Sequence, residues 1–418
     1  MGSNLTISTF IKRCSAFAPL VLSVAAFLAA LRIANTELFQ RFSFVVSDSI
    51  SRSLGEGHAG HVVLIRLDQS FSKPQLERLF SHAIPILLTD YRATAVGIDI
   101  DFSEGGYSQL ADDFAFWSEK NPADAGRVVW AVGYENAGES TAARDAENPF
   151  CEDCSGLSCK VRFVPKPVFG SVKDPTNYAL ALAVPDIDRV HRSSARFFCH
   201  SQTEKRLEGF HFRLVEIYCQ DHPAVATCGE LQQHKQARTN IYSWYDPEPL
   251  DLCQLVSCQE KDLGNKTDGL PNQINGKIVV LYSDVPSNDE HMTIMGERKG
   301  AEIVASLVEN ELQFGVAPHW RVQALEWSVE GTFTIGMILL FHWRYTRSWA
   351  ILIATALFVL YVYLVPRLAA WIPDFRNYAL AIIFTFWLEV LLKAAWQSIF
   401  GEHPKPVPAK AAEKSSAL

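Results

Sequence analysis

Four long apolar segments constrain this chain most, because each is close to the roughly 20 residues that an α-helix needs to cross a membrane. They cover residues 14–34, 325–343, 348–365 and 378–396. Tryptophan prefers the membrane interface, and five tryptophans lie at or near segment ends: Trp327, Trp343, Trp349, Trp371 and Trp396. We therefore predict one transmembrane helix over 14–34, three over 325–396, and a large domain over 35–324 between them.

Basic residues beside these segments predict their orientation. Lys12 and Arg13 precede the first segment. Lys393 lies near the end of the last segment, and Lys405 follows that segment. Because cytoplasmic flanks are enriched in Lys and Arg, we expect residues 1–13 and a disordered tail, 397–418, to be cytoplasmic. The domain 35–324 is then periplasmic or external to a bacterial inner membrane. The first segment could instead be a secretion signal, although no small-x-small cleavage pattern follows it.

Charge and motifs exclude several function classes. The formal net charge is −8, so no broad basic field is available to bind nucleic acid. The predicted cytoplasmic segments are far shorter than the roughly 150 residues of a kinase or cyclase domain. We find no G-x-S-x-G, no glycine-rich phosphate loop and no H-E-x-x-H. We therefore expect a protein that is not an enzyme and that has no cofactor and no bound metal.

Eight of the nine cysteines lie in a middle region, 136–271. An even number in an exterior domain predicts disulfide bonds and an oxidising compartment. Zinc binding by the Cys151-x-x-Cys154 pair is the alternative, but no second ligand pair accompanies it. Proximity alone suggests two pairings, Cys219 with Cys228 and Cys253 with Cys258, and leaves Cys14 free. The eight are Cys151, Cys154, Cys159, Cys199, Cys219, Cys228, Cys253 and Cys258.

Apolar runs alternate with helical patterns along the exterior domain. Short runs at 62–67, 94–100, 128–132 and 277–282 predict buried strands, and 189–198 is a plausible further strand. Helical spacing predicts helices over 73–91, 210–218 and 298–312, with Pro85 kinking or ending the first. This alternation predicts an α/β domain with a largely parallel sheet, in addition to the four transmembrane helices.

Acidic residues close the predicted strands. Asp68, Asp99 and Asp101 lie where two strands end, and Asp289 and His291 follow the last strand. Because open α/β sheets bind ligands at the carboxyl ends of their strands, these five residues are our candidate ligand site, suited to a hard cation or an amine. The alternative is structural: Asp68 caps the following helix and Asp101 pairs with an arginine.

Two acids lie inside predicted membrane segments. Glu330 falls early in the second segment and Glu389 late in the fourth. Acids in a membrane are costly, so we expect both to contact a partner or water. Glu389 could also form an interfacial pair with Lys393, one helical turn later.

Several stretches, in order, resemble the second subfamily of CHASE, the cyclase- and histidine-kinase-associated sensory extracellular domain. VVLIRLD ends at Asp68, and AVGIDIDFSE covers 95–104. VPDIDRVHR covers 184–192, TNIYSWYD starts at Thr239, NGKIVVLYSD at Asn275 and KGAEIVASLVENEL at Lys299. Three predicted transmembrane helices after the domain complete the resemblance. It implies an extracytoplasmic sensory domain, and most relatives continue into a cytoplasmic output domain.

The sequence thus predicts a membrane-anchored extracytoplasmic sensory or scaffold subunit. It would bind a protein or small ligand outside and act through another membrane or envelope protein, or through a second copy of the chain. Two alternatives stay open. One is a structural component of a cell-envelope assembly, and the other is a transport or channel accessory that uses Glu330 and Glu389 as a proton relay.

Overall fold

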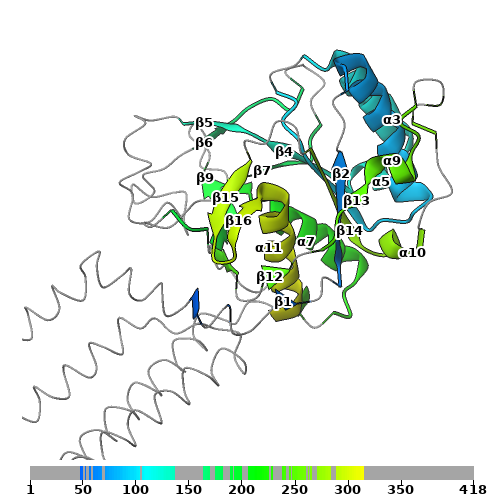
Figure 1. The fold of residues 1–418 in the computed structure, drawn as a ribbon. Helices are drawn as coiled ribbons and strands as arrows, with labels where there is room; N and C mark the ends of the chain where they lie inside the picture. The colour runs from blue at the N-terminus through cyan, green and yellow to red at the C-terminus, as the bar shows by residue number, and fades with distance from the viewer. Residues whose placement is uncertain are drawn as a thin grey trace, which may run out of the picture. The chain divides into compact units, whose positions relative to one another are not determined.

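The computed structural model describes residues between 48 and 314, and every residue that it describes belongs to one compact unit (Figure 1). The described residues are 48–49, 52, 56–57, 60–67, 71–103, 106–136, 163–169, 175–181, 189–191, 193–199, 206–225, 227–228, 238–241, 244–245, 247–259, 262, 264–265, 271–283 and 289–314.

A sheet of six parallel strands forms the centre of the domain, in the order β13-β2-β14-β3-β4-β7. The four strongest apolar runs of the sequence form its four middle strands, as predicted. The bounds are β2 (Val62–Leu67), β3 (Ala95–Asp99), β4 (Val128–Val132), β7 (Tyr178–Leu180), β13 (Leu250–Asp251) and β14 (Ile278–Ser283).

Short strands pair outside this sheet. β15 (Glu290–Thr293) and β16 (Gly296–Lys299) form an antiparallel hairpin, and β1 (Glu56–Gly57) pairs in parallel with β12 (Trp244–Tyr245). The other antiparallel pairs are β5 (Tyr134–Asn136) with β6 (Phe163–Pro165), β8 (Ser193–Ala195) with β11 (Arg238–Asn240), and β9 (Phe197–Cys199) with β10 (Arg206–Glu208).

Helices cover both faces of the sheet (Figure 1). On one face α3 (Lys73–Thr89), α4 (Ser108–Lys120) and α9 (Leu252–Leu255) share a hydrophobic core with one set of strand residues. On the other face α7 (Phe210–Asp221) and α11 (Gly300–Phe314) share a second core with the alternate set. The short helices are α5 (Pro122–Ala125) and α10 (Pro271–Ile274). The result is a three-layer α/β domain, typical of parallel sheets buried on both faces.

One local prediction is narrowed by the structure and another differs from it. Of the two effects expected of Pro85, an end of the helix is excluded, because α3 continues to Thr89 with Ile84, Leu87 and Leu88 buried in the core. The strand predicted over 189–198 is split: Arg189 has a positive φ of 65°, and β8 and β9 pair with different partners.

The predicted fold class needs a correction. The α/β domain is present, but within the described part of the chain no helix combines the length and apolar character needed to cross a membrane. α3 is the longest of these helices with 17 residues, which span about 26 Å at 1.5 Å per residue, against a hydrocarbon core of about 30 Å. The four segments on which the prediction rested, with Glu330 and Glu389, lie outside the described residues.

Disulfide bonds are present in the middle region. Cys219 is bonded to Cys228 and Cys253 to Cys258, which confirms both pairings expected from proximity. Cys199 is also disulfide-bonded. The predicted disulfide cysteines Cys151, Cys154 and Cys159, and the free Cys14, lie outside the described residues.

Candidate functional site

Gly97 allows the helix α7 to approach the sheet closely at β3. A Cβ atom at this position would lie 2.8 Å from the Phe210 ring and 2.9 Å from a Leu214 methyl group, closer than real contacts allow. Glycine weakens a strand interior but marks places where another element approaches. This packing brings the first turn of α7, with Phe210 and His211, next to the carboxyl end of β3.

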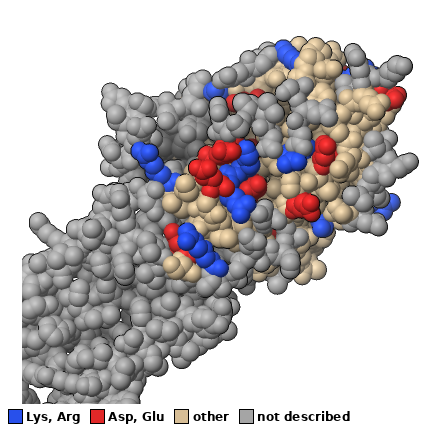
Figure 2. Space-filling model, in the orientation of Figure 1, with Lys and Arg blue, Asp and Glu red and all other residues tan. Residues whose placement is uncertain are grey.

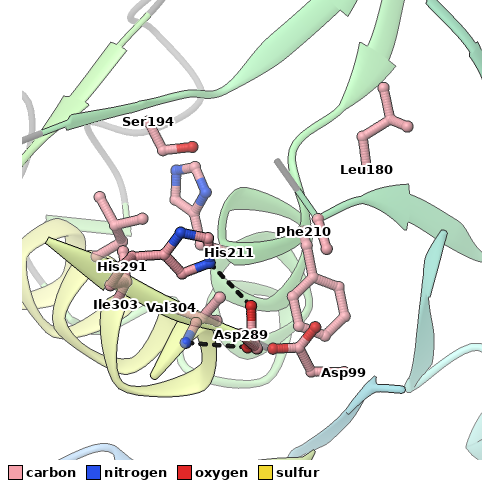
Figure 3. A pocket seen from close by; sticks show the side chains of 12 residues that line it. Asp99, Leu180, Ser194, Phe210, His211, Asp289, His291, Ile303 and Val304 are labelled. Carbon is pink, nitrogen blue, oxygen red and sulfur yellow. Dashed lines mark hydrogen bonds and ion pairs between the residues drawn. The ribbon is translucent and has the colours of Figure 1, made fainter. Parts of the chain in front are cut away.

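A pocket lies at this carboxyl end, between β3, β7, α7, α11 and the start of the β15–β16 hairpin (Figure 3). Its volume is about 60 Å³, where a single water needs about 10 to 15 Å³. The space therefore accommodates a small chemical group. The lining residues are Asp99, Leu180, Ala181, Ser194, Phe210, His211, Asp289, His291, Gly300, Ile303, Val304 and Leu307.

The side chain of Asp289 forms hydrogen bonds both to the β15–β16 hairpin and to Gly300, the first residue of α11. One carboxylate oxygen, Oδ1, contacts His291 Nε2 at 2.8 Å, and the other, Oδ2, accepts a hydrogen bond from the Gly300 backbone N–H at 3.0 Å. A Cβ atom at position 300 would lie 2.4 Å from Oδ2, so glycine is required for this approach. The carboxylate thereby neutralises the positive end of the helix dipole. Its hydrogen bond raises the pKa of His291.

Asp99 ends β3 and faces the same space (Figure 3). Its carboxyl group forms no hydrogen bond with any residue that the structure describes. Burial, and secondarily the nearby charge of Asp289, raise its pKa from 3.8 to about 7, against a smaller opposing effect of His291. Asp99 therefore exchanges its proton near neutral pH, unlike an ordinary aspartate.

Two further histidines near the pocket are neutral at physiological pH. The ring of His191 is buried and stands edge-on to the His291 ring, with centroids 4.9 Å apart. Burial, then the charge of His291, lower the pKa of His191 to about 4. Burial, then the charge of Arg196, lower the pKa of His211 to about 3.

Arg196 is itself held in a buried ion pair. Its Nε donates to Glu311 Oε1 at 2.7 Å and its Nη2 donates to Glu311 Oε2, while the Phe212 ring lies 5.0 Å from the guanidinium. Each side chain of the pair is only 1% exposed. The pair lies in the core, and Arg196 does not line the pocket, although its charge acts on His211.

The structure brings together three of the five predicted site residues, Asp99, Asp289 and His291. Asp101 is exposed, accepts a hydrogen bond from the Ser103 backbone N–H at 2.8 Å, and does not line the pocket. Asp68 lies outside the described residues. Within the part of the chain that the structure describes, no group of three or more His, Cys, Asp or Glu side chains is arranged to hold a metal ion.

Sequence reasoning missed Ser194, Phe210 and His211 as pocket residues. Ser194 belongs to a strand too short for apolar alternation to reveal. His211 stands between two phenylalanines at the start of α7, and this polar residue inside an apolar run is the sequence signal that could have been weighed; in the structure it is 2% exposed.

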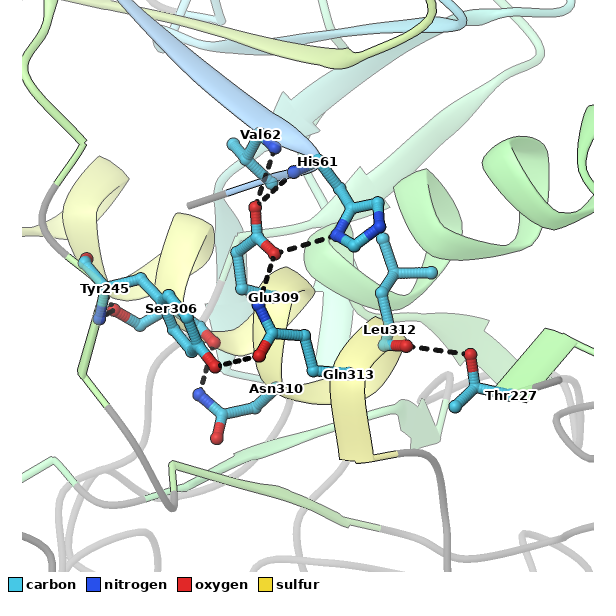
Figure 4. A network of polar contacts seen from close by, with 9 residues as sticks. All are labelled: His61, Val62, Thr227, Tyr245, Ser306, Glu309, Asn310, Leu312 and Gln313. Atoms are coloured by element: carbon cyan, nitrogen blue, oxygen red, sulfur yellow. Dashed lines mark hydrogen bonds and ion pairs between the residues drawn. The ribbon is translucent and has the colours of Figure 1, made fainter. Parts of the chain in front are cut away.

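Near the carboxyl end of α11, far from Gly300, the helix forms hydrogen bonds to the start of β2 (Figure 4). Oε1 of the fully buried Glu309 accepts hydrogen bonds from the backbone N–H groups of His61, at 2.6 Å, and Val62, at 2.9 Å. Oε2 contacts His61 Nδ1 at 2.9 Å. One turn earlier, Ser306 hydrogen-bonds the backbone of Tyr245. α11 therefore connects the pocket, at one end, to the first residues of β2 at the other.

The surface over the β15–β16 hairpin carries mixed charge (Figure 2). Lys299 pairs with Glu290 at 3.2 Å, and Arg298 lies 4.0 Å from Glu302. Exposed pairs of this kind contribute little stability, and the signs alternate, so this face offers no single-sign field for a charged macromolecule.

Comparison with known families decides the family of the chain. The sequence model of the CHASE2 domain matches residues 21–343, most of the chain. The chain belongs to the CHASE2 domain family. CHASE2 domains are extracellular sensory domains, so a sensory role and a position outside the cytoplasm follow for this chain. No curated protein and no solved structure matched it.

Proposed function

We propose that this CHASE2 protein is a sensory subunit, not an enzyme, whose pocket at the carboxyl end of β3 binds a small ligand. The observation that carries the proposal is the convergence of Asp99, which ends β3, with Asp289 and His291 of the β15–β16 hairpin on one pocket that apolar side chains also line. This is where open α/β sheets bind their ligands. Polar and charged side chains beside apolar ones such as Phe210 and Leu307 are typical of small-molecule sites.

α11 offers a route from the pocket to the rest of the domain. Gly300, Ile303, Val304 and Leu307 line the pocket on one stretch of the helix, and Glu309 holds the first residues of β2. A ligand can act only through states that it binds differently. A small shift of α11 would change both the pocket and the hydrogen bonds of Glu309, so we propose that this helix carries the signal.

We further propose that the domain faces an oxidising compartment, the bacterial periplasm, and that it acts through a partner membrane or envelope protein or a second copy of the chain. The disulfide bonds Cys219–Cys228 and Cys253–Cys258 support the compartment. A purely structural envelope component would need no ligand in this pocket, so a ligand retained there distinguishes the sensory function from the structural one.

The test compares the small molecules retained by the purified full-length protein and by Val304→Trp, which fills the pocket. Met292→Trp, at a 45% exposed residue outside the pocket lining, is the matched control. Proteins purified from the native host are denatured, and released compounds are identified by mass spectrometry. We expect a compound that wild type and Met292→Trp release and Val304→Trp lacks. Identical profiles from all three proteins would contradict ligand binding at this pocket.

A further inference from the structure

We propose that the ligand of this pocket is a small organic cation, a primary ammonium group with a short carbon chain, bound by the carboxylate of Asp99 beside that of Asp289. The inference rests on the proposed function, since it names the ligand class of the same pocket. Four observations support it: the hydrogen bonds still open, the charge of the lining, the size of the space, and the proton of Asp99.

The carboxylates differ in what they already bind. Asp289 has one oxygen on His291 and the other on the Gly300 backbone N–H. Asp99 forms no hydrogen bond with a described residue, although it ends a buried strand and lines the pocket. Asp99 is half-buried, and an ionised carboxylate in such a position gains from a charged hydrogen-bond donor. An ammonium group, with three N–H donors and a positive charge, supplies the missing partner.

The lining favours a cation electrostatically. It contains two carboxylates and neither lysine nor arginine. Arg196, whose charge acts on His211, lies outside the lining and forms an ion pair with Glu311 in the core. His191 is 5% exposed, its ring lies beside that of His291, and its Nδ1 has no hydrogen-bond partner among the residues that the structure describes. Since burial keeps His191 and His211 neutral, neither opposes a positive ligand.

The size and walls of the pocket limit the ligand to a small one. A volume of about 60 Å³ accommodates an ammonium group and few carbon atoms. Phe210, Ile303 and Leu307 provide the apolar wall against which a short alkyl chain would pack. An ethylammonium ion has the charge, the donors and the apolar end that this arrangement requires.

Binding is expected to release up to one proton, nearly all of it at pH 6 and little of it at pH 8. The pKa of Asp99 is about 7 in the empty pocket, and a bound cation stabilises the ionised carboxylate. The proton leaves Asp99 for the buffer, while the ammonium group keeps its own protons, as lysine does with a pKa of about 10.4. The titratable groups that face Asp99 are Asp289 and His291 from the hairpin side and His211 from α7; α11, β7 and β8 present none at the pocket. Protonation of His291 at low pH also opposes a cation, so both effects weaken binding as pH falls.

The experiment is calorimetric titration of the full-length protein with three probes of similar size and different charge: ethylammonium, ethanol and acetate. We expect ethylammonium to bind at least about ten-fold more tightly than either other probe at pH 8. Between pH 8 and pH 6 its affinity should fall about ten-fold, because the ionised fraction of a group with pKa about 7 falls by that factor. Asp99→Asn should lose at least about ten-fold in affinity, while Asp101→Asn, an acid near the same edge but outside the pocket lining, should behave as wild type.

Failure of this inference is distinguishable from failure of the proposed function. If ethanol or acetate binds as tightly as ethylammonium, and Val304→Trp abolishes that binding, the pocket is a ligand site but the cation assignment is wrong. Ethylammonium binding that Asp99→Asn leaves unchanged, or absence of ethylammonium binding, also overturns the assignment. The proposed function itself fails only if the released-compound profiles of wild type and Val304→Trp are identical.

Discussion

Replacing Asp99 by asparagine should stabilise the domain at neutral and higher pH, although it removes a proposed ligand contact. The ionised carboxylate is held near Asp289 in a partly buried position where no described residue hydrogen-bonds it. Asparagine keeps the shape and carries no charge at any pH. The wild-type residue therefore costs stability that the variant recovers, as is common for binding groups in functional sites.

The magnitude follows from the pKa of Asp99, which rises from 3.8 to about 7 on folding. Because the folded-state pKa lies above the unfolded value, the contribution to stability is complete below pH about 4 and is lost as pH rises through about 7. One pKa unit corresponds to about 1.4 kcal/mol, so the full cost is up to about 4 kcal/mol. Between pH 5 and pH 8 the advantage of Asp99→Asn over wild type should grow by about 2 to 3 kcal/mol.

Urea unfolding of the full-length protein, followed by the fluorescence of the buried Trp130 and Trp244, measures this difference at each pH. Taking the difference between variants removes most of the contribution of groups that both proteins share, such as His211. Asp101→Asn, at an exposed residue outside the pocket lining, is the control and should lack the gain in stability that Asp99→Asn shows at pH 8. An Asp99→Asn advantage that is independent of pH, or a variant less stable than wild type at pH 8, would refute the reasoning.

Three further outcomes are expected. Glu309→Ala should lower the free energy of unfolding by about 3 to 5 kcal/mol in urea, since it leaves two backbone N–H groups without an acceptor, whereas Glu309→Gln should cost about 1 to 2 kcal/mol; equal losses would contradict this role. Arg196→Met should cost about 3 to 5 kcal/mol by leaving Glu311 unpaired in the core, and adding Glu311→Met should recover part of that loss; a double variant less stable than the single one would count against the pair. Alkylation of the unfolded, unreduced chain should label about one cysteine, Cys14, as mass analysis will show; labelling of most cysteines would overturn the disulfide assignment.

The central sheet could be predicted from the sequence because its strands are continuous apolar runs closed by polar residues. The runs at 62–67 and 128–132 match β2 and β4 residue for residue. The local pattern could not decide whether Pro85 ends the helix, and α3 continues past it because its tertiary packing outweighs a local proline penalty of about 3 kcal/mol. The strand over 189–198 failed because apolar pattern does not reveal a positive φ at Arg189, nor a change of pairing partner between β8 and β9.

The candidate site was predicted in part, for a topological reason. Asp99, Asp289 and His291 follow strands whose carboxyl ends meet at one edge, so their convergence could be expected from strand order alone. The sequence could not show that Asp99 lines the pocket and Asp101 does not, because this depends on the direction in which each side chain points. His211 joins the site only because Gly97 lets α7 approach β3, a contact between residues more than 100 positions apart.

Coupling between the pocket and the far end of α11 is the central claim, and hydrogen exchange of single amides tests it most directly. The backbone N–H groups of His61 and Val62 donate to Glu309 and lie away from the pocket lining. Exchange of these two amides should be compared in wild type, in pocket-filled Val304→Trp and in the control Met292→Trp. We predict a change of several-fold at both amides in Val304→Trp and none in Met292→Trp. A change confined to the residues that line the pocket, with both amides unaffected, would contradict the account.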